Sequence, residues 1–509
     1  MDQHPQPAES SAGATPLLPA GEPVSHIDLG AFSKDLLHGI LDLHAKHGPI
    51  AAIQDGQLRV VLIFSPELNQ QVLSDTARYH ARFFAIRGPK NSAQRRLTSG
   101  LLSMNGEQHR RNRRLVKEPF GRAAIATYAA TIERLTDEML ASWRTGDVHD
   151  LAEEMRRYML HVTSTILFGL DEPELAYRLG DMIADWVSLN DAVGAGALVP
   201  NEVFSCRYED LLAFAERLEA AILELIRFRR ESGEFGGDVL SILVRTHDEE
   251  GGLTDEELVG QAAVLFAAAH MTTAHALTWT LFLLAEHPSV MRQVWEELQM
   301  DASGLATPNA CGGEDAERAG ESLSVLERVI KESMRILPAS AYSQRFNNEA
   351  VDLGPFHLPR GTGIAFTPLV THRLPELYPN PKRFLPDRWL TLRPSPYAYH
   401  PFGAGARLCI GGPLALDVLR IALRTILLRF RLQVVPGAEI SAHVESTMLM
   451  PTHGVPVQIH PPDGRFAASP VDGNIHELVD LVETPAFVAD ECVAGSDEPA
   501  LSYTPRRPR

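Results

Sequence analysis

The sequence predicts a mainly α-helical protein with a smaller β portion, and two kinds of pattern support this fold class. Apolar residues recur at helical spacing in long segments, among them residues 132–143, 207–231 and 413–430. Strand-like runs are short and lie near the two ends of the chain, at residues 58–64 and 453–460. Helices therefore dominate the expected fold.

The longest helical segment, residues 258–288, is apolar enough to raise the question of a membrane span. A capping box, Thr254 followed by Glu257, marks its start. Polar residues such as Gln261, His270 and His275 cluster near its middle, where insertion into a bilayer is costly. We therefore expect this segment to be a buried central helix.

Composition and charge exclude several classes of protein. The 509 residues are 45% hydrophobic and 22% charged, and 65 acidic residues outnumber 47 Lys and Arg for a net charge of −18. This acidic balance argues against non-specific binding to nucleic acid, which needs a basic surface. The chain begins without a signal-peptide pattern, and we expect a cytoplasmic monomer.

The sequence predicts one domain between two terminal tails. Residues 1–25 are rich in Pro and Ala and are expected to be disordered, and residues 26–462 form the expected domain. Residues 463–509 are expected to be a tail, disordered or loosely docked, in which residues 474–488 could form a short amphipathic helix. Residues 301–322 are expected to be a surface loop between two helices.

The four cysteines indicate a single special thiol. Cys206, Cys311, Cys409 and Cys492 are scattered without a C-x-x-C pair, which fits neither a disulfide framework nor a zinc site. Cys409 lies among glycines directly before an apolar helix, and the amides and dipole of a helix N-terminus favour a thiolate. Such a lone thiolate suits a metal whose other ligands come from a cofactor, as in haem. The alternative is a buried free cysteine in a glycine turn.

The residues around Cys409 distinguish a haem ligand from a buried free cysteine. They reproduce F-x-x-G-x-R-x-C-x-G through Phe402, Gly405, Arg407, Cys409 and Gly411. This pattern resembles the haem-binding signature of the cytochrome P450 family. The resemblance implies haem b (iron protoporphyrin IX), held between a long central helix and the helix that follows the cysteine loop. It makes Cys409 the axial iron ligand and places Phe402 and Gly411 in the cofactor site.

Two further motifs extend the resemblance over about residues 26–462. Glu332 and Arg335 stand three apart on one helix face. Downstream, the segment NPKRFLPDRWL resembles the family's P-x-x-F-x-P-x-R pattern and supplies Arg388. The resemblance implies that Glu332, Arg335 and Arg388 form a structural network near the haem.

A third motif concerns the haem carboxylates. His109 and Arg113 match the family's H-x-x-x-R, and the resemblance implies that they hold the haem propionates together with Arg345 and Arg407. Buried propionates need cationic donors, because an unpaired carboxylate is costly to bury. The neighbouring residues that would point away from the haem are expected to help dock an acidic electron donor. These residues are Arg110, Arg114 and Lys117.

The central helix departs from the family pattern on the side where oxygen is expected. The family's [A/G]-G-x-[D/E]-T corresponds to residues 268–272, and Thr272, with Thr273 beside it, is the expected catalytic hydroxyl. Ala269 replaces the glycine, and Met271 replaces the acid that would relay protons. His270 or His275, or ordered water, could take over this task.

The resemblance implies a monooxygenase that inserts one oxygen atom of dioxygen into a hydrophobic small molecule. Its electrons are expected from a separate ferredoxin or flavodoxin with its reductase. The alternatives are a peroxide-driven peroxygenase, an oxidative coupling or rearrangement enzyme, and a non-catalytic haem sensor. Residues 83–104 and 187–206 are expected to cover the substrate pocket.

Overall fold

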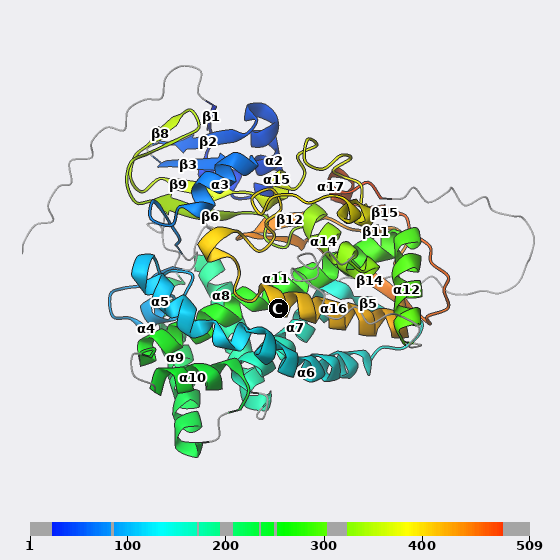
Figure 1. The fold of residues 1–509 in the computed structure, drawn as a ribbon, viewed down its shortest axis with the longest axis horizontal. Helices are drawn as coiled ribbons and strands as arrows, with labels where there is room; N and C mark the ends of the chain where they lie inside the picture. Colours follow the sequence, from blue (N-terminus) through cyan, green and yellow to red (C-terminus); the bar gives the residue numbers. More distant parts are fainter. Residues whose placement is uncertain are drawn as a thin grey trace, which may run out of the picture.

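The structure is a computed structural model, and it describes residues 23–56, 58–82, 86–169, 173–193, 207–233, 236–248, 252–302 and 323–481. Figure 1 shows the β-rich part at the top of the molecule and the long helices across the middle and below. The mainly α-helical fold with a smaller β portion is confirmed. Cys206, Cys311, Cys492 and residues 303–322 of the loop expected at 301–322 lie outside the described residues, while residues 301 and 302 are helical.

The helical part consists of long helices that pack around a central one. The longer helices are α2 (Leu36–His47), α5 (Gly106–Val116), α6 (Arg122–Leu140), α7 (Leu151–Phe168), α8 (Pro173–Val193), α9 (Tyr208–Ser232), α10 (Val239–Asp248), α11 (Asp255–Glu286), α12 (Pro288–Ala302), α14 (Val325–Ile336) and α16 (Gly412–Arg429). Shorter helices are α1 (Leu29–Phe32), α3 (Pro66–Ser74), α4 (Ala93–Leu97), α15 (Pro368–Thr371) and α17 (Ile475–Leu478). Single helical turns are η1 (Glu118–Phe120), η2 (Pro386–Leu390) and η3 (Gly405–Arg407).

Helix α11 is the buried central helix that the sequence predicts. Thr254 Oγ1 accepts from the Glu257 N–H at 3.2 Å, and the Glu257 carboxylate accepts from the Thr254 N–H at 3.0 Å, which completes the capping box. The helix packs against α7, α14 and α16, and Figure 1 shows it running through the middle of the molecule. Among the described helices, none has the length and apolar character needed to cross a bilayer.

The β portion forms one larger sheet and several small ones. The larger sheet has the order β1 (Val24–His26), β2 (Ile50–Asp55), β3 (Leu58–Ile63), β9 (Gly363–Phe366), β6 (Ser343–Asn347) and β4 (Tyr79–His80). A second sheet has the order β10 (Arg431–Val434), β14 (Pro456–His460) and β5 (Val148–Asp150). The remaining pairs are β7 (Val351–Leu353) with β8 (Phe356–Leu358), β11 (Ala438–Glu439) with β15 (Val471–Asp472), and β12 (Ala442–Glu445) with β13 (Met448–Pro451).

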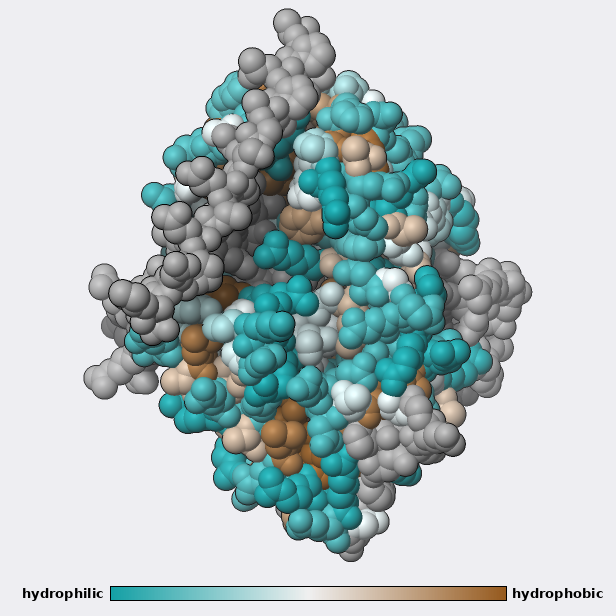
Figure 2. Space-filling view, turned by 90° about the vertical axis from the view of Figure 1, so that its left-hand side faces the viewer, coloured by the Kyte–Doolittle hydropathy of each residue, from teal (hydrophilic) through white to brown (hydrophobic). Residues whose placement is uncertain are grey.

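The core is rich in large apolar side chains. Trp143, Trp186, Trp279 and Trp389 are all fully buried. On the face that Figure 2 shows, hydrophilic residues predominate and apolar residues gather only in small groups. Burial of this apolar interior is the main favourable contribution to the stability of the fold.

The packed fold continues past residue 462, where the sequence analysis ended the domain. Strand β15 pairs with β11, and Ile475 and Leu478 of α17 are buried. The Asp480 N–H donates to the Lys382 carbonyl at 2.9 Å. Residues 463–481 are therefore part of the fold, and the first strand begins at Val24, slightly before the expected start. Residues 1–22 and 482–509 lie outside the described residues.

Candidate functional site

The loop before α16 is a tight turn that presents the Cys409 sulfur. Gly403 and Gly405 have φ angles of 72° and 68°, a region in which glycine is favoured. A Cβ atom on Gly405 would clash with the Leu73 carbonyl, so the loop also needs glycine for its close approach to α3. The Cys409 N–H donates to the Phe402 carbonyl at 2.9 Å. A Cβ atom on Gly412 would lie 3.5 Å from the Phe402 ring. These contacts fix the position of the thiol.

The surroundings of Cys409 have opposing effects on the pKa of its thiol. Burial raises the pKa of the thiol above its ordinary value, whereas hydrogen bonds from the Gly411 and Gly412 amides and the charge of Arg113 lower it. The side chain nevertheless has exposed surface. Many protein atoms thus surround the residue, yet part of its surface is exposed, so a ligand can reach it.

The structure brings the four predicted propionate ligands together. Burial, together with the charges of Arg407, Arg113 and Arg345, lowers the pKa of His109 to about 4. Burial and the neighbouring Arg407 lower the pKa of Arg345, on β6, to about 9. Burial and Arg113 lower the pKa of Arg407 to about 10. Each of these shifts includes, after burial, a contribution from a neighbouring arginine, so the four side chains lie near one another.

Arg407 and Arg113 are tied to the loops beside them. The Arg407 guanidinium donates to Asn105 Oδ1 at 2.7 Å and to the Met104 carbonyl, while its Nε is buried without a hydrogen-bond partner in the described structure. Arg113 donates to the Leu408 carbonyl at 2.6 Å, directly beside Cys409. Asn105 is a site residue that the sequence analysis missed, because its partner is about 300 residues away.

Glu332 joins the helical and downstream motifs. Its Oε1 accepts from Arg335 and from Arg388, each at 2.9 Å, and its Oε2 accepts from Arg335 at 3.0 Å. The Trp389 indole N–H donates to the same carboxylate at 3.0 Å. Glu332 and Arg335 are fully buried, so their charges are compensated by each other and not by water. The three network residues therefore meet as the resemblance implies.

The middle of α11 has accessible surface on one side. Ala268 is exposed, and Met271 and Thr272 are partly exposed, although the residues before and after this stretch are buried. The Thr272 hydroxyl donates to the Ala268 carbonyl at 2.8 Å. Thr273 is buried, so the structure separates the two threonines predicted to be catalytic. Only Thr272 lies on the accessible side.

The two histidines that could replace the missing acid have different surroundings. His270 is buried, and one of its ring nitrogens lies 3.0 Å from the Arg156 carbonyl on α7, at hydrogen-bonding distance. His275 is also buried, and its Nε2 has no hydrogen-bond partner in the described structure. Burial lowers the pKa of each imidazole to about 4, so both rings are neutral near pH 7.

The segment expected to cover the substrate pocket is anchored to neighbouring helices. On α4, the Gln94 carboxamide accepts from the Trp186 indole at 2.7 Å and donates to Asn190 Oδ1 at 2.9 Å, which ties α4 to α8. Arg96 binds both carboxylate oxygens of Glu219 on α9 at 2.5 and 2.6 Å. Residues 83–85 and 194–206 of the two expected covering segments lie outside the described residues.

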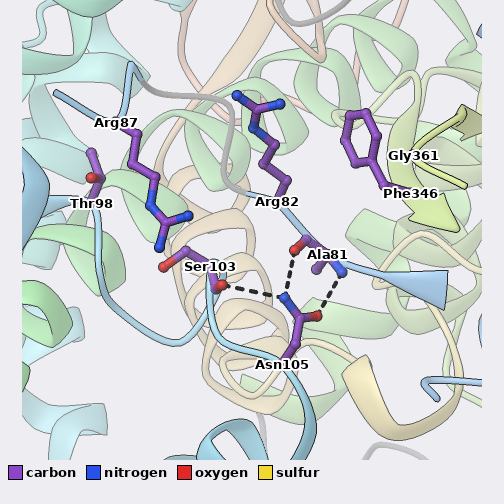
Figure 3. A pocket seen from close by; sticks show the side chains of 8 residues that line it. All are labelled: Ala81, Arg82, Arg87, Thr98, Ser103, Asn105, Phe346 and Gly361. Carbon is purple, nitrogen blue, oxygen red and sulfur yellow. Dashed lines mark hydrogen bonds between the residues drawn. The ribbon is translucent and has the colours of Figure 1, made fainter. Parts of the chain in front are cut away.

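A cavity of about 390 Å³ lies beside this site, between the β-sheet and the segment that follows β4. Figure 3 shows its lining, with Asn105 hydrogen-bonded to Ala81. Its described lining residues, which do not include Cys409, are Ala81, Arg82, Arg87, Thr98, Ser103, Asn105, Phe346 and Gly361. Three of them, Arg87, Thr98 and Ser103, belong to the segment 83–104 that is expected to cover the substrate pocket.

The residues present fit a haem. Cys409 is exposed, and three arginines, Arg113, Arg345 and Arg407, form a group of cations that can receive two carboxylates; the Arg407 Nε has no partner in the described structure. Helices α11 and α16 contact each other. Ala268 on α11 is exposed, and so is Cys409 in the loop directly before α16. A flat ring system bound between them would cover both surfaces.

The comparisons with known proteins agree with this arrangement. Residues 24–459 match the family model described as Cytochrome P450. The chain is 33% identical over 405 residues to the cyclooctat-9-en-7-ol 5-monooxygenase of Streptomyces melanosporofaciens, a match that covers 77% of this chain and 84% of the relative. It is 31% identical over 463 residues to the pentalenene oxygenase of Streptomyces avermitilis, which covers 89% of this chain and 97% of the relative.

Solved structures show the same fold. A retinoic acid-bound cyanobacterial protein matches with a TM-score of 0.67 and 22% identity over 83% of this chain and 93% of that chain. The heme domain of cytochrome P450DA matches with a TM-score of 0.68 and 23% identity over 84% of this chain and 94% of that chain. Motifs, fold and relatives agree, and the chain belongs to the cytochrome P450 family of haem proteins as one of its monooxygenases.

Proposed function

We propose that Cys409 is the axial ligand of a haem b whose propionates are held by His109, Arg113, Arg345 and Arg407. The observation that carries this proposal is that an exposed cysteine in a tight turn lies near a group of three arginines and the neutral His109. When bound, a thiolate-ligated haem supplies the oxidising power that inserts oxygen into C–H bonds. Phe402 and Gly411 shape the loop around the sulfur, since the Gly411 amide donates to it.

Thr272 is the residue that we propose to handle protons at the oxygen site. Its hydroxyl can donate to the Ala268 carbonyl, as it does here, or rotate and donate toward the accessible side of α11. A hydroxyl can pass on a proton only if another donor supplies it. Because Met271 cannot do so, ordered water next to Thr272 is the proposed donor. Thr273, being buried, supports the helix and does not touch the reacting atoms.

The substrate is proposed to be an apolar small molecule. Two relatives are named for acting on cyclooctat-9-en-7-ol and pentalenene, an alkenol and an alkene by their names. Leu102, in the segment expected to cover the pocket, exposes 41% of its surface and so offers an apolar side chain there. Its neighbour Leu101 is fixed to α11, since the Leu101 N–H donates to Gln261 Oε1 at 3.1 Å.

Electrons are proposed to come from a separate ferredoxin or flavodoxin served by its reductase. Arg114 and Lys117 are exposed on α5 and at its end, on the helix that also carries Arg113, whose guanidinium reaches the residue beside Cys409. Arg110 is exposed as well and pairs with Glu107 at 2.6 Å. An acidic donor would be attracted to these charges, and its binding would weaken as salt is added.

Peroxide-driven oxygenation is a second candidate function, and Met271 favours it. Hydrogen peroxide already carries the electrons and protons that the dioxygen reaction must collect, so the missing acid would matter less. The test is to give purified holoenzyme a panel of apolar substrates with either dioxygen and reduced ferredoxin or hydrogen peroxide alone. Product mainly in the first arm supports the dioxygen monooxygenase, and product mainly in the second supports the peroxygenase. Absence of product in both arms would contradict both proposals.

A further inference from the structure

The cavity beside the haem site is lined by two exposed arginines, Arg82 and Arg87. A third, Arg95 on α4, acts electrostatically on Arg87. In Figure 3 the Arg87 side chain extends toward Ser103, while Arg82 rises next to Ala81 and Phe346 lies beyond it. The chain has more acidic than basic residues, so a local group of three arginines is not explained by its average composition.

Among the described residues, no carboxylate forms an ion pair with Arg82, Arg87 or Arg95. Burial lowers the pKa of Arg87, and the charges of Arg95 and Arg82 act in the same direction. The Nε of Arg95 is buried without a hydrogen-bond partner in the described structure. The Arg82 guanidinium lies 5.7 Å from the centre of the Phe346 ring, a contact with an aromatic face and not with a carboxylate. Like charges held together in this way favour binding of an anion.

The cavity adjoins the propionate cluster but has its own cations. Asn105 lines the cavity and accepts a hydrogen bond from Arg407. The charges that act on His109 come from Arg407, Arg113, Arg345 and Arg110, and neither Arg82 nor Arg87 is among them. The arginines of the cavity therefore form a second group, next to the one assigned to the haem.

We propose that this cavity is a binding subsite for an anionic group, a carboxylate or a phosphate, of a small molecule other than the haem. Guanidinium groups bind both kinds of anion through paired hydrogen bonds, and Arg82 and Arg87 line the cavity from two sides. A volume of about 390 Å³ admits such a group together with part of an apolar chain, which the Phe346 ring can contact.

The test measures binding directly, so it is independent of the reaction proposed above. Isothermal titration calorimetry of the purified holoenzyme would compare dodecanoate, dodecan-1-ol and inorganic phosphate. We expect dodecanoate to bind at least about tenfold more tightly than the uncharged alcohol, because charge-assisted hydrogen bonds are the strong ones. Phosphate binding as tightly as dodecanoate would assign the subsite to a free inorganic anion, and weaker phosphate binding would assign it to an organic one.

Variants separate this subsite from its neighbours. Arg87→Gln is expected to lower the affinity for dodecanoate about tenfold without changing that for dodecan-1-ol, and Arg87→Lys should retain most of the affinity because it keeps the charge. The matched control is Arg78→Gln, since Arg78 is exposed and paired with Glu349. Unchanged dodecanoate binding in Arg87→Gln would overturn the proposal. So would loss of haem from that variant, because Arg87 would then belong to the propionates.

Discussion

The Gln261 carboxamide on α11 donates to Asn112 Oδ1 on α5 at 3.2 Å, and both side chains are fully buried. Gln261 also accepts from the Leu101 N–H, and Asn112 donates to Glu257 Oε1 at 2.9 Å. One pair of amides thus joins the helix that bears Thr272, the helix that bears His109 and Arg113, and the segment that precedes them.

Replacing Gln261 by leucine is expected to destabilise the protein. The change leaves the Leu101 N–H and the Asn112 carboxamide oxygen buried without partners, and each unsatisfied group costs about 1–3 kcal/mol. Chemical denaturation should show the free energy of unfolding lowered by about 2–4 kcal/mol. Gln299→Leu is the control, since Gln299 is exposed on α12 and its replacement should change stability by less than about 0.5 kcal/mol. Equal stability of the two variants would contradict this account.

Glu332→Ala is expected to be more damaging, because it leaves the buried guanidinium of Arg335 and that of Arg388 without their carboxylate. Removing one partner of a buried ion pair costs about 3–5 kcal/mol. The free energy of unfolding and the yield of folded protein measure the effect. Glu349→Ala removes an exposed carboxylate paired with Arg78 and should cost less than about 1 kcal/mol. A Glu332→Ala protein as stable as that control would show that the network contributes little.

Cys409→Ser is expected to abolish thiolate ligation of the haem, because a serine hydroxyl is a poor substitute for a soft anionic sulfur. The absorbance spectrum of the reduced protein with carbon monoxide would lose the thiolate signature, whatever the activity. Cys311→Ser serves as the control, since the sequence gives Cys311 no part in the haem motif. If the Cys409→Ser variant kept the thiolate signature, Cys409 would not be the axial ligand of the haem.

Met271→Glu is expected to restore a proton donor beside Thr272, because residue 271 is partly exposed on the accessible side of α11. The product formed per electron pair in the dioxygen reaction should rise several-fold, whereas peroxide-driven turnover should stay the same. Met271→Leu, which keeps an apolar side chain, should resemble the unaltered protein. If product formation rises in neither reaction, the supply of protons does not limit the dioxygen reaction.

The raised pKa of the Glu286 carboxyl leads us to expect that the stability of the protein depends on pH. Burial raises the pKa of this carboxyl from 4.5 to about 7, opposed by a hydrogen bond from the Ser469 N–H. The folded state therefore binds a proton that the unfolded state has released between these values, so stability falls as pH rises from about 4.5 to 7. The shift corresponds to about 3 kcal/mol. Glu286→Gln should lack this loss, and its stability relative to the unaltered protein should rise between pH 5 and pH 8. A constant difference across this range would contradict the prediction.

The features that depend on residues close together in the sequence could be predicted from it. The glycine pattern around Cys409 and the spacing of Glu332 and Arg335 can be recognised within one turn or one helix, and the structure has the turn and the ion pair there. The central helix could also be predicted, because a capping box and a long apolar run are local signals. Fold class followed from such patterns, and this prediction is confirmed.

The contacts that sequence reasoning missed join residues far apart in the chain. Asn105 meets Arg407, Gln94 meets Trp186, and Gln261 meets Asn112, and none of these pairs has a spacing that periodicity could reveal. The segment 463–481 was taken for a tail because only a few of its residues are large and apolar. Those few, including Ile475 and Leu478, are the ones that are buried.

The docked segment at the end of the fold affects how this enzyme can be engineered. His38 of α2 lies 3.0 Å from Glu477, and the Asp480 N–H donates to Lys382, in the segment that leads to Arg388. Shortening the chain to residue 462 would uncover the surfaces against which Ile475 and Leu478 pack, and would invite aggregation. A reductase or ferredoxin fused to supply electrons in one polypeptide should therefore be joined after residue 481, with this segment left as the anchor of the linker.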